Sequence, residues 1–425
     1  MRKPSYLYCW TLTVSLFIAG GCGWFFGFSN RTASFQFTDT ANPSFLEAQS
    51  LVQGRLALSS RVHDTALYNG RIVNAFQPGQ TLFFLAHLLV NGKEALGYFQ
   101  LELFLIFLCS FCVFFDAIVR LSGGKVLFSA FLALSIFCGA PYMASFPVAL
   151  KGSVCRVDHC FSLLFVSIAL LLLSRKPSTA RYFWIGGCVG MAMLFREQNV
   201  GVLLLPLCML LQDANGQAWA IRRNLMDPME RRELMKRCAV LLVCPLLASM
   251  ILGGFQMGRF GSPFETGYAY IYEGRSGYLA QRARTYGLMS LHFLPENVFR
   301  TFWAAPYLEF AGWRIVRVIG DPRGNSLIFS EPILLLCCVL WRRLREVRVQ
   351  AFVLVAGMLA VPVFLYHNPG VLGPGYMRRS LDYLLLWAAT LAVGTRDVRG
   401  SNIILLGVAG ALTVWAIGYV RLLIQ

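Results

Sequence analysis

Long apolar segments recur along almost the whole chain, and they constrain its fold more than any other feature. Hydrophobic residues occupy 57% of the 425 positions and charged residues only 14%, whereas about a quarter of the residues in a typical soluble domain are charged. An apolar run of about 17 to 25 residues is long enough to cross the bilayer core as a helix. The alternating short strands of a transmembrane barrel are not evident. The sequence therefore predicts an all-α integral membrane protein.

We place about eleven transmembrane helices in a single membrane domain that covers residues 1–425. The short pair 182–195 and 199–212 forms either two spans or one broken or re-entrant element. Segments 80–92 and 291–310 are apolar but interrupted, so we expect interfacial or partly buried helices there. The predicted spans are 6–28, 97–119, 126–146, 160–174, 182–195, 199–212, 238–257, 327–341, 350–366, 380–395 and 402–422.

The N-terminal segment has the basic start and apolar core that a signal peptide also has. Its apolar stretch is about 20 residues long, however, and no small-x-small cleavage site follows it. We interpret 6–28 as an uncleaved first helix.

The basic residues are distributed unevenly between the two membrane faces. With the N-terminus in the cytoplasm, the inner segments hold 19 of the 38 Lys and Arg residues and the short outer segments hold six. The other 13 lie in two long outer loops, 29–96 and 258–325, where the positive-inside rule has little force. This bias predicts a cytoplasmic N-terminus, and it explains the net charge of +17 without a nucleic-acid partner.

The thirteen cysteines do not indicate a metal site. Most of them lie inside apolar spans, where cysteine behaves as a small apolar side chain. No CxxC pair is accompanied by a partner pair, so zinc is not expected. A disulfide between Cys155 and Cys160 is the less favoured alternative to two free thiols.

Three acids, Asp39, Glu47 and Asp64, lie in the first long outer loop. A carboxylate at this position can deprotonate a hydroxyl group, as transfer of a sugar to an acceptor requires. The alternative is that these acids are solvated or cap helices. In particular, Asp39 with Asn42-Pro43 could begin a helix that includes Glu47, since proline is favoured in a first turn.

Charged pairs also occur where predicted spans reach the outer face. Asp158 and His159 lie at the mouth of a span, either as a polar helix end or as groups that face a cavity. Arg196 and Glu197 separate two short apolar segments, near a depth where charges are rare and usually functional. A purely structural Arg–Glu pair is the alternative.

Two more outer segments carry groups suited to binding a phosphorylated sugar. Residues 259–274 are rich in aromatic side chains, including Tyr268, which either stack on sugar rings or form an interfacial belt. Arg378 and Arg379 end the loop 367–379, against the inside bias of positive charge. Two guanidinium groups suit a phosphate, and pairing with Asp382 or with lipid phosphates is the alternative.

Several of these segments, in order, resemble polytopic membrane glycosyltransferases of superfamily C. This group includes the protein mannosyltransferases and bacterial lipid-linked-sugar transferases, and the match is closest to bacterial proteins near glycosyltransferase family 39. The resemblance covers most of the chain. It is carried by LVQGRLAL (51–58), HDTALYNGR (63–71), FQPGQTLFFL (76–85), RFGSPFETGY (259–268), GLMSLHFLPENVF (287–299) and RRSLD (378–382).

The resemblance implies an inverting sugar transfer on the extracytoplasmic side of a bacterial inner membrane. The donor would be a polyprenyl-phosphate-linked sugar and the acceptor a glycan, lipid or protein. An acid of the first loop acts as base, for which Asp39 is the first candidate and Asp64 the second. The family usually has a second acid after this Asp, whereas Thr40 stands here, so we expect no metal or other cofactor.

Six further residues are the predicted substrate-binding groups. Arg378 and Arg379, with Arg196 in reserve, would stabilise the departing lipid phosphate. Asp158, His159 and Tyr268 would complete the site. The alternative functions are a lipid-linked oligosaccharide ligase, polymerase or flippase, and a non-catalytic transporter-like protein or scaffold.

Overall fold

The computed structural model describes residues 10, 13–14, 42–92, 99–143, 145–146, 149, 153–212, 219–220, 226–321, 324–368, 378–398 and 403–424. This part of the chain is mostly helical and contains six helices that are long and apolar enough to cross a membrane. The protein is therefore a multi-pass integral membrane protein. The six are α4 (Phe99–Leu121), α5 with α6 (Val126–Met143), α8 (Val154–Leu173), α12 (Pro228–Phe260), α16 (Val347–Leu365) and α18 (Ile403–Ile424).

Four of the other five predicted spans are also helical but shorter. Predicted span 182–195 corresponds to α9 (Thr179–Phe195), and 199–212 to the 3-10 helix η2 (Glu197–Leu203) followed by α10 (Leu204–Leu210). Predicted spans 327–341 and 380–395 correspond to α15 (Leu327–Ser330) with η5 (Pro332–Arg343), and to α17 (Leu381–Gly394) after η6 (Arg378–Ser380). Residues 6–28 lie almost entirely outside the described residues. A count of eleven spans stays a prediction.

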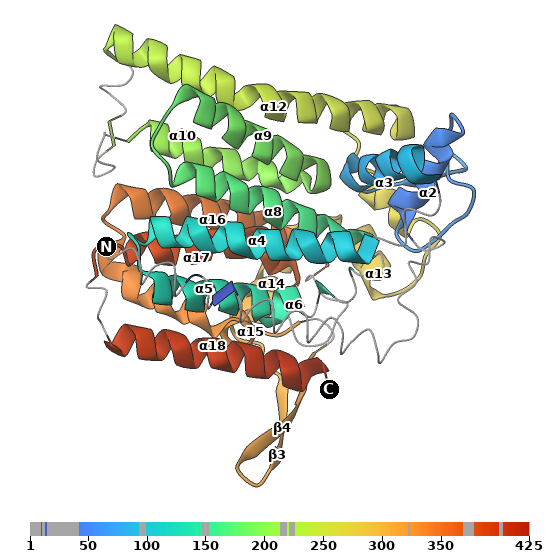
Figure 1. Ribbon diagram of the computed structural model, residues 1–425. Helices are drawn as coiled ribbons and strands as arrows, with labels where there is room; N and C mark the ends of the chain where they lie inside the picture. The colour runs from blue at the N-terminus through green and yellow to red at the C-terminus, as the bar shows by residue number, and fades with distance from the viewer. Residues whose placement is uncertain are drawn as a thin grey trace.

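Helices α9 and α12 lie side by side in the bundle (Figure 1) because glycines let their backbones approach closely. A Cβ atom at Gly186 would lie 2.1 Å from the carbonyl oxygen of Leu241, and one at Gly190 would lie 2.9 Å from that of Cys244. The spacing of four places both glycines on one face of α9, as in other small-residue interfaces between membrane helices.

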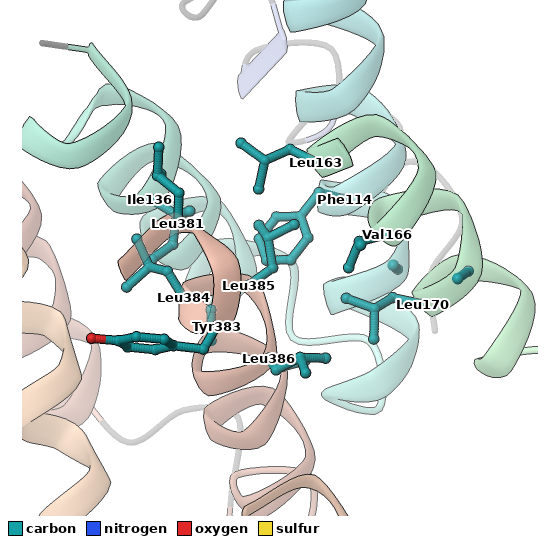
Figure 2. Close-up of a cluster of buried hydrophobic side chains, with 14 of the residues drawn as sticks. Phe114, Ile136, Leu163, Val166, Leu170, Leu381, Tyr383, Leu384, Leu385 and Leu386 are labelled. Atoms are coloured by element: carbon teal, nitrogen blue, oxygen red, sulfur yellow. The ribbon is translucent and has the colours of Figure 1, made fainter. Parts of the chain in front are cut away.

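Helix α17 forms the centre of the bundle. All of its residues except Trp387 are buried, as expected of a helix that is apolar on every side and surrounded by others. Its leucines Leu384, Leu385 and Leu386 lie in the same buried cluster as Phe114 of α4 and side chains of α5 and α8 (Figure 2).

Short helices lie together beyond one end of the bundle (Figure 1): α2 (Pro43–Val52), α3 (Pro78–Asn91) and α13 (Tyr278–Tyr286). Helix α2 begins where its sequence predicts, because the Asn42 side chain accepts hydrogen bonds from the backbone N–H groups of Ser44 and Phe45 and Pro43 occupies the first turn. The helix includes Glu47, so the helical alternative for this acid is confirmed.

The prediction of an all-α fold was wrong in two places. Strands β1 (Thr65–Tyr68) and β2 (Arg71–Asn74) form an antiparallel hairpin in the first loop. Its turn is Asn69-Gly70, with φ of 49° and 75°, the positive angles that a two-residue type I′ turn requires. The motif HDTALYNGR is thus largely a hairpin.

A second hairpin interrupts the predicted interfacial segment 291–310. The segment begins with helix, as η4 (Leu291–Phe293) and α14 (Leu294–Phe302), but continues into β3 (Tyr307–Ala311). Strand β3 pairs with β4 (Arg314–Ile319), and the hairpin projects from the bundle beyond α18 (Figure 1).

A buried ion pair between Glu47 and Arg259 fixes the end of α12 to the first loop. Both side chains are 0% exposed. Arg259 Nε donates to Glu47 Oε1 over 2.6 Å, Nη2 donates to Oε2, and Nη1 donates to the Phe76 carbonyl over 2.6 Å. Thr81 and Asn74 also donate to Glu47 Oε2, over 2.7 and 3.0 Å. This network joins α2, β2, α3 and α12.

Candidate functional site

A cavity of about 310 Å³ lies at the bundle end that carries α2, α3 and α13; we call it the site cavity. Its wall is formed by the start of α8, the turn between α9 and η2, η3 (Tyr268–Tyr272), the end of α16, and η6. Five of the six predicted binding residues line it, together with residues that were not predicted. The lining residues are Phe76, Gln77, Cys155, His159, Arg196, Glu197, Gln198, Thr266, Tyr268, Leu288, Met289, Pro362, Val363, Tyr366, Arg378 and Arg379.

Arg196 forms a forked ion pair with Asp382 in the cavity wall. Its Nε and Nη2 atoms donate to the two carboxylate oxygens over 2.6 and 2.8 Å. The Asp382 carboxylate is 1% exposed, and it also accepts a hydrogen bond from Gln198. Arg196 therefore does not pair with Glu197, as the structural alternative proposed. It pairs with Asp382, which lies 186 positions further along the chain.

Arg378 and Arg379 line the same cavity, and neither forms an ion pair with a carboxylate among the described residues. They do not pair with Asp382, which was the alternative, because the Asp382 carboxylate is paired with Arg196. The guanidinium carbon of Arg379 lies 4.0 Å from the centre of the Tyr366 ring. The Nε atoms of both arginines are buried without a hydrogen-bond partner in this part of the chain. The pair presents uncompensated positive charge to the cavity.

Glu197 of η2 adds a negative charge to the cavity wall, and Gln77, just before α3, adds a neutral donor. Gln77 Nε2 donates to the Tyr268 hydroxyl over 3.0 Å. Burial raises the pKa of Tyr268 well above its ordinary value, so the phenol stays protonated. Among the described residues that line the cavity, Glu197 is the only carboxylate.

Of the predicted pair at the start of α8, His159 lines the cavity and Asp158 does not. His159 Nδ1 lies 3.4 Å from Asp382 Oδ1. Asp158 is buried behind the wall, where it accepts a hydrogen bond of 2.6 Å from Gln80. Gln80 Oε1 in turn accepts one of 3.2 Å from Asn42. Asp158 therefore connects α8 to α3 and to the first turn of α2.

Of the two candidate bases, the structure describes only Asp64, and Asp64 does not line the cavity. Asp39 lies outside the described residues. Asp64 precedes β1 with φ of 66°, and its carboxylate lies 2.9 Å from His63 Nδ1, a side chain that is 72% exposed. The hydrogen bond and the charge of Asp64 raise the pKa of His63. The catalytic roles of both acids stay predictions.

The aromatic run 259–274 divides between several positions. Phe260 and Tyr270 pack against Tyr68 of β1, with ring centres 5.4 and 4.9 Å away. Phe264 is 92% exposed, and Tyr268 alone of this group of four faces the cavity. A single sugar-stacking face along the run is therefore not formed.

His367 directly follows Tyr366, which lines the site cavity. Its Nε2 atom is 2.7 Å from the Tyr272 hydroxyl, and Arg282 Nε donates to its carbonyl over 2.8 Å. Burial, together with the nearby charge of Arg379, lowers the pKa of His367 to about 4. The imidazole is therefore neutral at physiological pH.

Glu197, Gln77, Gln198 and Tyr366 were missed as site residues. The sequence did contain a signal for two of them, because Glu197 and Gln198 follow Arg196 in the turn of the broken hairpin. Within the described ranges, no three His, Cys, Asp or Glu side chains cluster in a way that could hold a metal ion. Metal-independent action stays a prediction.

No protein-family model and no curated protein matches the chain. Two solved structures are similar to it. The first is the apo oligosaccharyltransferase of Archaeoglobus fulgidus, with a TM-score of 0.51 and 11% identity over 99% of this chain. The second is ArnT of Cupriavidus metallidurans, bound to undecaprenyl phosphate, with a TM-score of 0.41 and 15% identity over 89% of this chain.

The chain spans only part of both proteins, 56% of the oligosaccharyltransferase and 60% of ArnT. At such low identity, the similarity to the oligosaccharyltransferase concerns the fold. The chain has a membrane fold similar to that of this oligosaccharyltransferase.

Proposed function

We propose that the protein transfers a sugar from a polyprenyl-phosphate donor to an acceptor at the site cavity. The observation that carries this proposal is the position of Arg378 and Arg379. Both line the cavity and neither pairs with a carboxylate among the described residues. Two guanidinium groups that meet no described carboxylate in a partly enclosed space favour an anion, and a phosphate accepts their forked hydrogen bonds.

The donor phosphate becomes the leaving group in this reaction. The bond between the anomeric carbon and the phosphate oxygen breaks, and the polyprenyl phosphate departs with additional negative charge. Arg378 and Arg379 stabilise that charge, and a setting that excludes water strengthens each contact. Arg196 contributes less, because its guanidinium is already paired with Asp382.

A carboxylate accepts the proton of the acceptor hydroxyl as the new glycosidic bond forms, with inversion at the anomeric carbon. The family resemblance favours Asp39 for this role. Glu197 offers a second candidate, because it is a carboxylate in the cavity wall. Asp64 lies outside the wall and is the third.

The charge bias of the loops supports the orientation of the protein. A cytoplasmic N-terminus places the site cavity on the extracytoplasmic side, where a polyprenyl-linked donor and a glycan, lipid or protein acceptor would meet. The proposed location is the inner membrane of a bacterium.

The test is transfer of radiolabelled sugar from defined polyprenyl-phosphate donors to membrane-extract acceptors by the purified full chain. We expect transfer by the wild-type protein and its loss in Asp39→Asn, with Glu197→Gln and Asp64→Asn assayed in parallel. If only Glu197→Gln is inactive, the assignment of the base to Asp39 fails. If no donor yields product while the phosphate lipid binds, the proposed transfer itself fails.

A further inference from the structure

A second, larger cavity of about 510 Å³ lies at the opposite end of the helices that form the site cavity; we call it the basic cavity. Cys155 and His159 at the start of α8 line the site cavity, whereas Leu173 at its end lines the basic cavity. At 1.5 Å per residue, the helix separates these lining residues by about 20 to 27 Å. The basic cavity is lined by seven basic side chains and one acid, Glu230. The basic residues are Arg120, Arg175, Lys176, Arg181, Arg237, Arg348 and Arg396.

At least three of these charges are not paired with a carboxylate of the described residues. Arg120 and Arg237 pair with Asp116 and Glu233 of their own helices, over 3.0 and 2.8 Å. In the described part of the chain, Arg175, Lys176 and Arg181 form no ion pair with a carboxylate. Like charges gathered around one cavity repel one another, so an anion in the cavity would stabilise this arrangement.

Arg181 is the buried member of the group. Its side chain is 8% exposed, and Nη2 donates to the Tyr182 hydroxyl over 2.9 Å while Nη1 donates to the Arg175 carbonyl. Its Nε atom is buried without a hydrogen-bond partner among the described residues. The guanidinium is therefore held in place by the protein and retains a free donor.

Neither helix dipoles nor membrane topology explains why so many basic side chains line this cavity. The C-terminal ends of α4, α8, α10 and α17 point toward it, each equivalent to about half a negative charge. The N-terminal ends of α9, α12 and α16 offset three of these four ends, so the helix ends leave only a fraction of a charge against seven basic side chains. The positive-inside rule accounts for basic residues at this membrane face, but it does not require seven of them to line one space.

We propose that the basic cavity binds the phosphate group of an anionic ligand, which is either the headgroup of a membrane lipid or a soluble phosphate compound. Basic pockets between membrane helices bind lipid phosphates in this way, and guanidinium groups suit a phosphate from either source. The proposal is independent of glycosyl transfer, because it rests on a cavity at the other end of the bundle.

The experiment measures thermal unfolding of the purified full chain with two probes. Sodium pyrophosphate represents a soluble ligand, and phosphatidylglycerol in phosphatidylcholine nanodiscs represents a lipid. A ligand that binds only the folded state raises Tm as its concentration rises. A response to pyrophosphate identifies a soluble source, and a response to phosphatidylglycerol alone identifies a lipid.

Charge-reversal variants locate the response. In R175E/K176E the apparent affinity should fall by about 30-fold or more, because two basic contributions are removed. The matched control R232E/K236E changes one Arg and one Lys at the same end of the bundle that do not line the cavity, and it should respond as the wild-type protein does. R378Q/R379Q should also respond, because its substitutions lie in the site cavity.

Three results would overturn the proposal. The first is that neither probe raises Tm. The second is that R175E/K176E responds as strongly as the control. The third is that R378Q/R379Q abolishes the response, since the phosphate would then bind only in the site cavity.

Discussion

Two sets of arginines near the same end of the molecule differ in what surrounds their charge. Arg259 is fully buried, and its guanidinium is matched by Glu47 and the Phe76 carbonyl. Arg378 and Arg379 line a cavity and meet no carboxylate in the described chain. Charge that the protein neutralises internally holds the first loop against α12. Charge that it leaves uncompensated is available for a ligand.

The largest expected effect on stability comes from breaking the buried ion pair between Glu47 and Arg259. Glu47→Gln should lower the free energy of unfolding by about 3–5 kcal/mol, because it leaves the Arg259 charge buried without its partner. Denaturant unfolding in detergent measures this change. The control Glu233→Gln removes a half-exposed partner of Arg237 and should change stability by less than about 0.5 kcal/mol. Equal stability of both variants would show that the Glu47 network is not structural.

Removing the uncompensated charge should affect transfer instead of folding. R378Q/R379Q is expected to lower the transfer rate by about 100- to 1000-fold, because the departing phosphate loses its cationic contacts. Its unfolding should match that of the wild-type protein. R314Q/R317Q, two exposed arginines of β4, is the matched control. A wild-type transfer rate in R378Q/R379Q would contradict the claim that these two arginines stabilise the departing phosphate.

Arg196 is intermediate, since it lines the cavity but is paired. Arg196→Lys replaces the fork to Asp382 with a single ammonium contact, and we expect a loss of about 1.5–3 kcal/mol in unfolding free energy. Arg343→Lys, whose partner Glu346 is 37% exposed, should change stability by less than about 1 kcal/mol. If both substitutions lower the free energy of unfolding by the same amount, the pair with Asp382 does not stabilise the fold, and Arg196 resembles Arg378 and Arg379 instead.

The last expected effect is a pH dependence of stability that arises from His367. Its pKa is lowered from 6.5 to about 4 in the folded protein, so between these values the unfolded state binds a proton that the folded state does not. Stability should therefore fall as pH decreases from 6.5 to 4 and level off below that range. Thermal unfolding across this range, compared with His367→Gln, measures the effect. An unchanged slope in the variant would show that His367 is not the titrating group.

The sequence predicted the helical membrane architecture well, since apolar length is a local property. The sequence also indicated that a helix begins at Asn42-Pro43 and that the helical segment is interrupted at Arg196. The first hairpin was missed although Asn69-Gly70 lies between two short β-prone stretches, because the segment was interpreted only as a polar loop with a family motif.

The pairing of charges could not be read from the sequence. Asp382 is four residues from Arg378, the spacing of neighbours on a helix face, yet its carboxylate pairs with Arg196, 186 positions away. Only the packing of α17 beside the end of α9 decides this choice. The same packing decides that Glu197 faces the cavity and that Asp158 lies behind its wall.

The most direct test of the central claim compares two lipids that differ in one group. Binding of a polyprenyl phosphate and of the corresponding polyprenol is measured for protein in phosphatidylcholine nanodiscs. The wild-type protein should prefer the phosphate by about 100-fold, from two charge-assisted contacts. R175E/K176E should keep this preference, and R378Q/R379Q should lose it. A preference that persists in R378Q/R379Q would contradict the assignment of the donor phosphate to the site cavity.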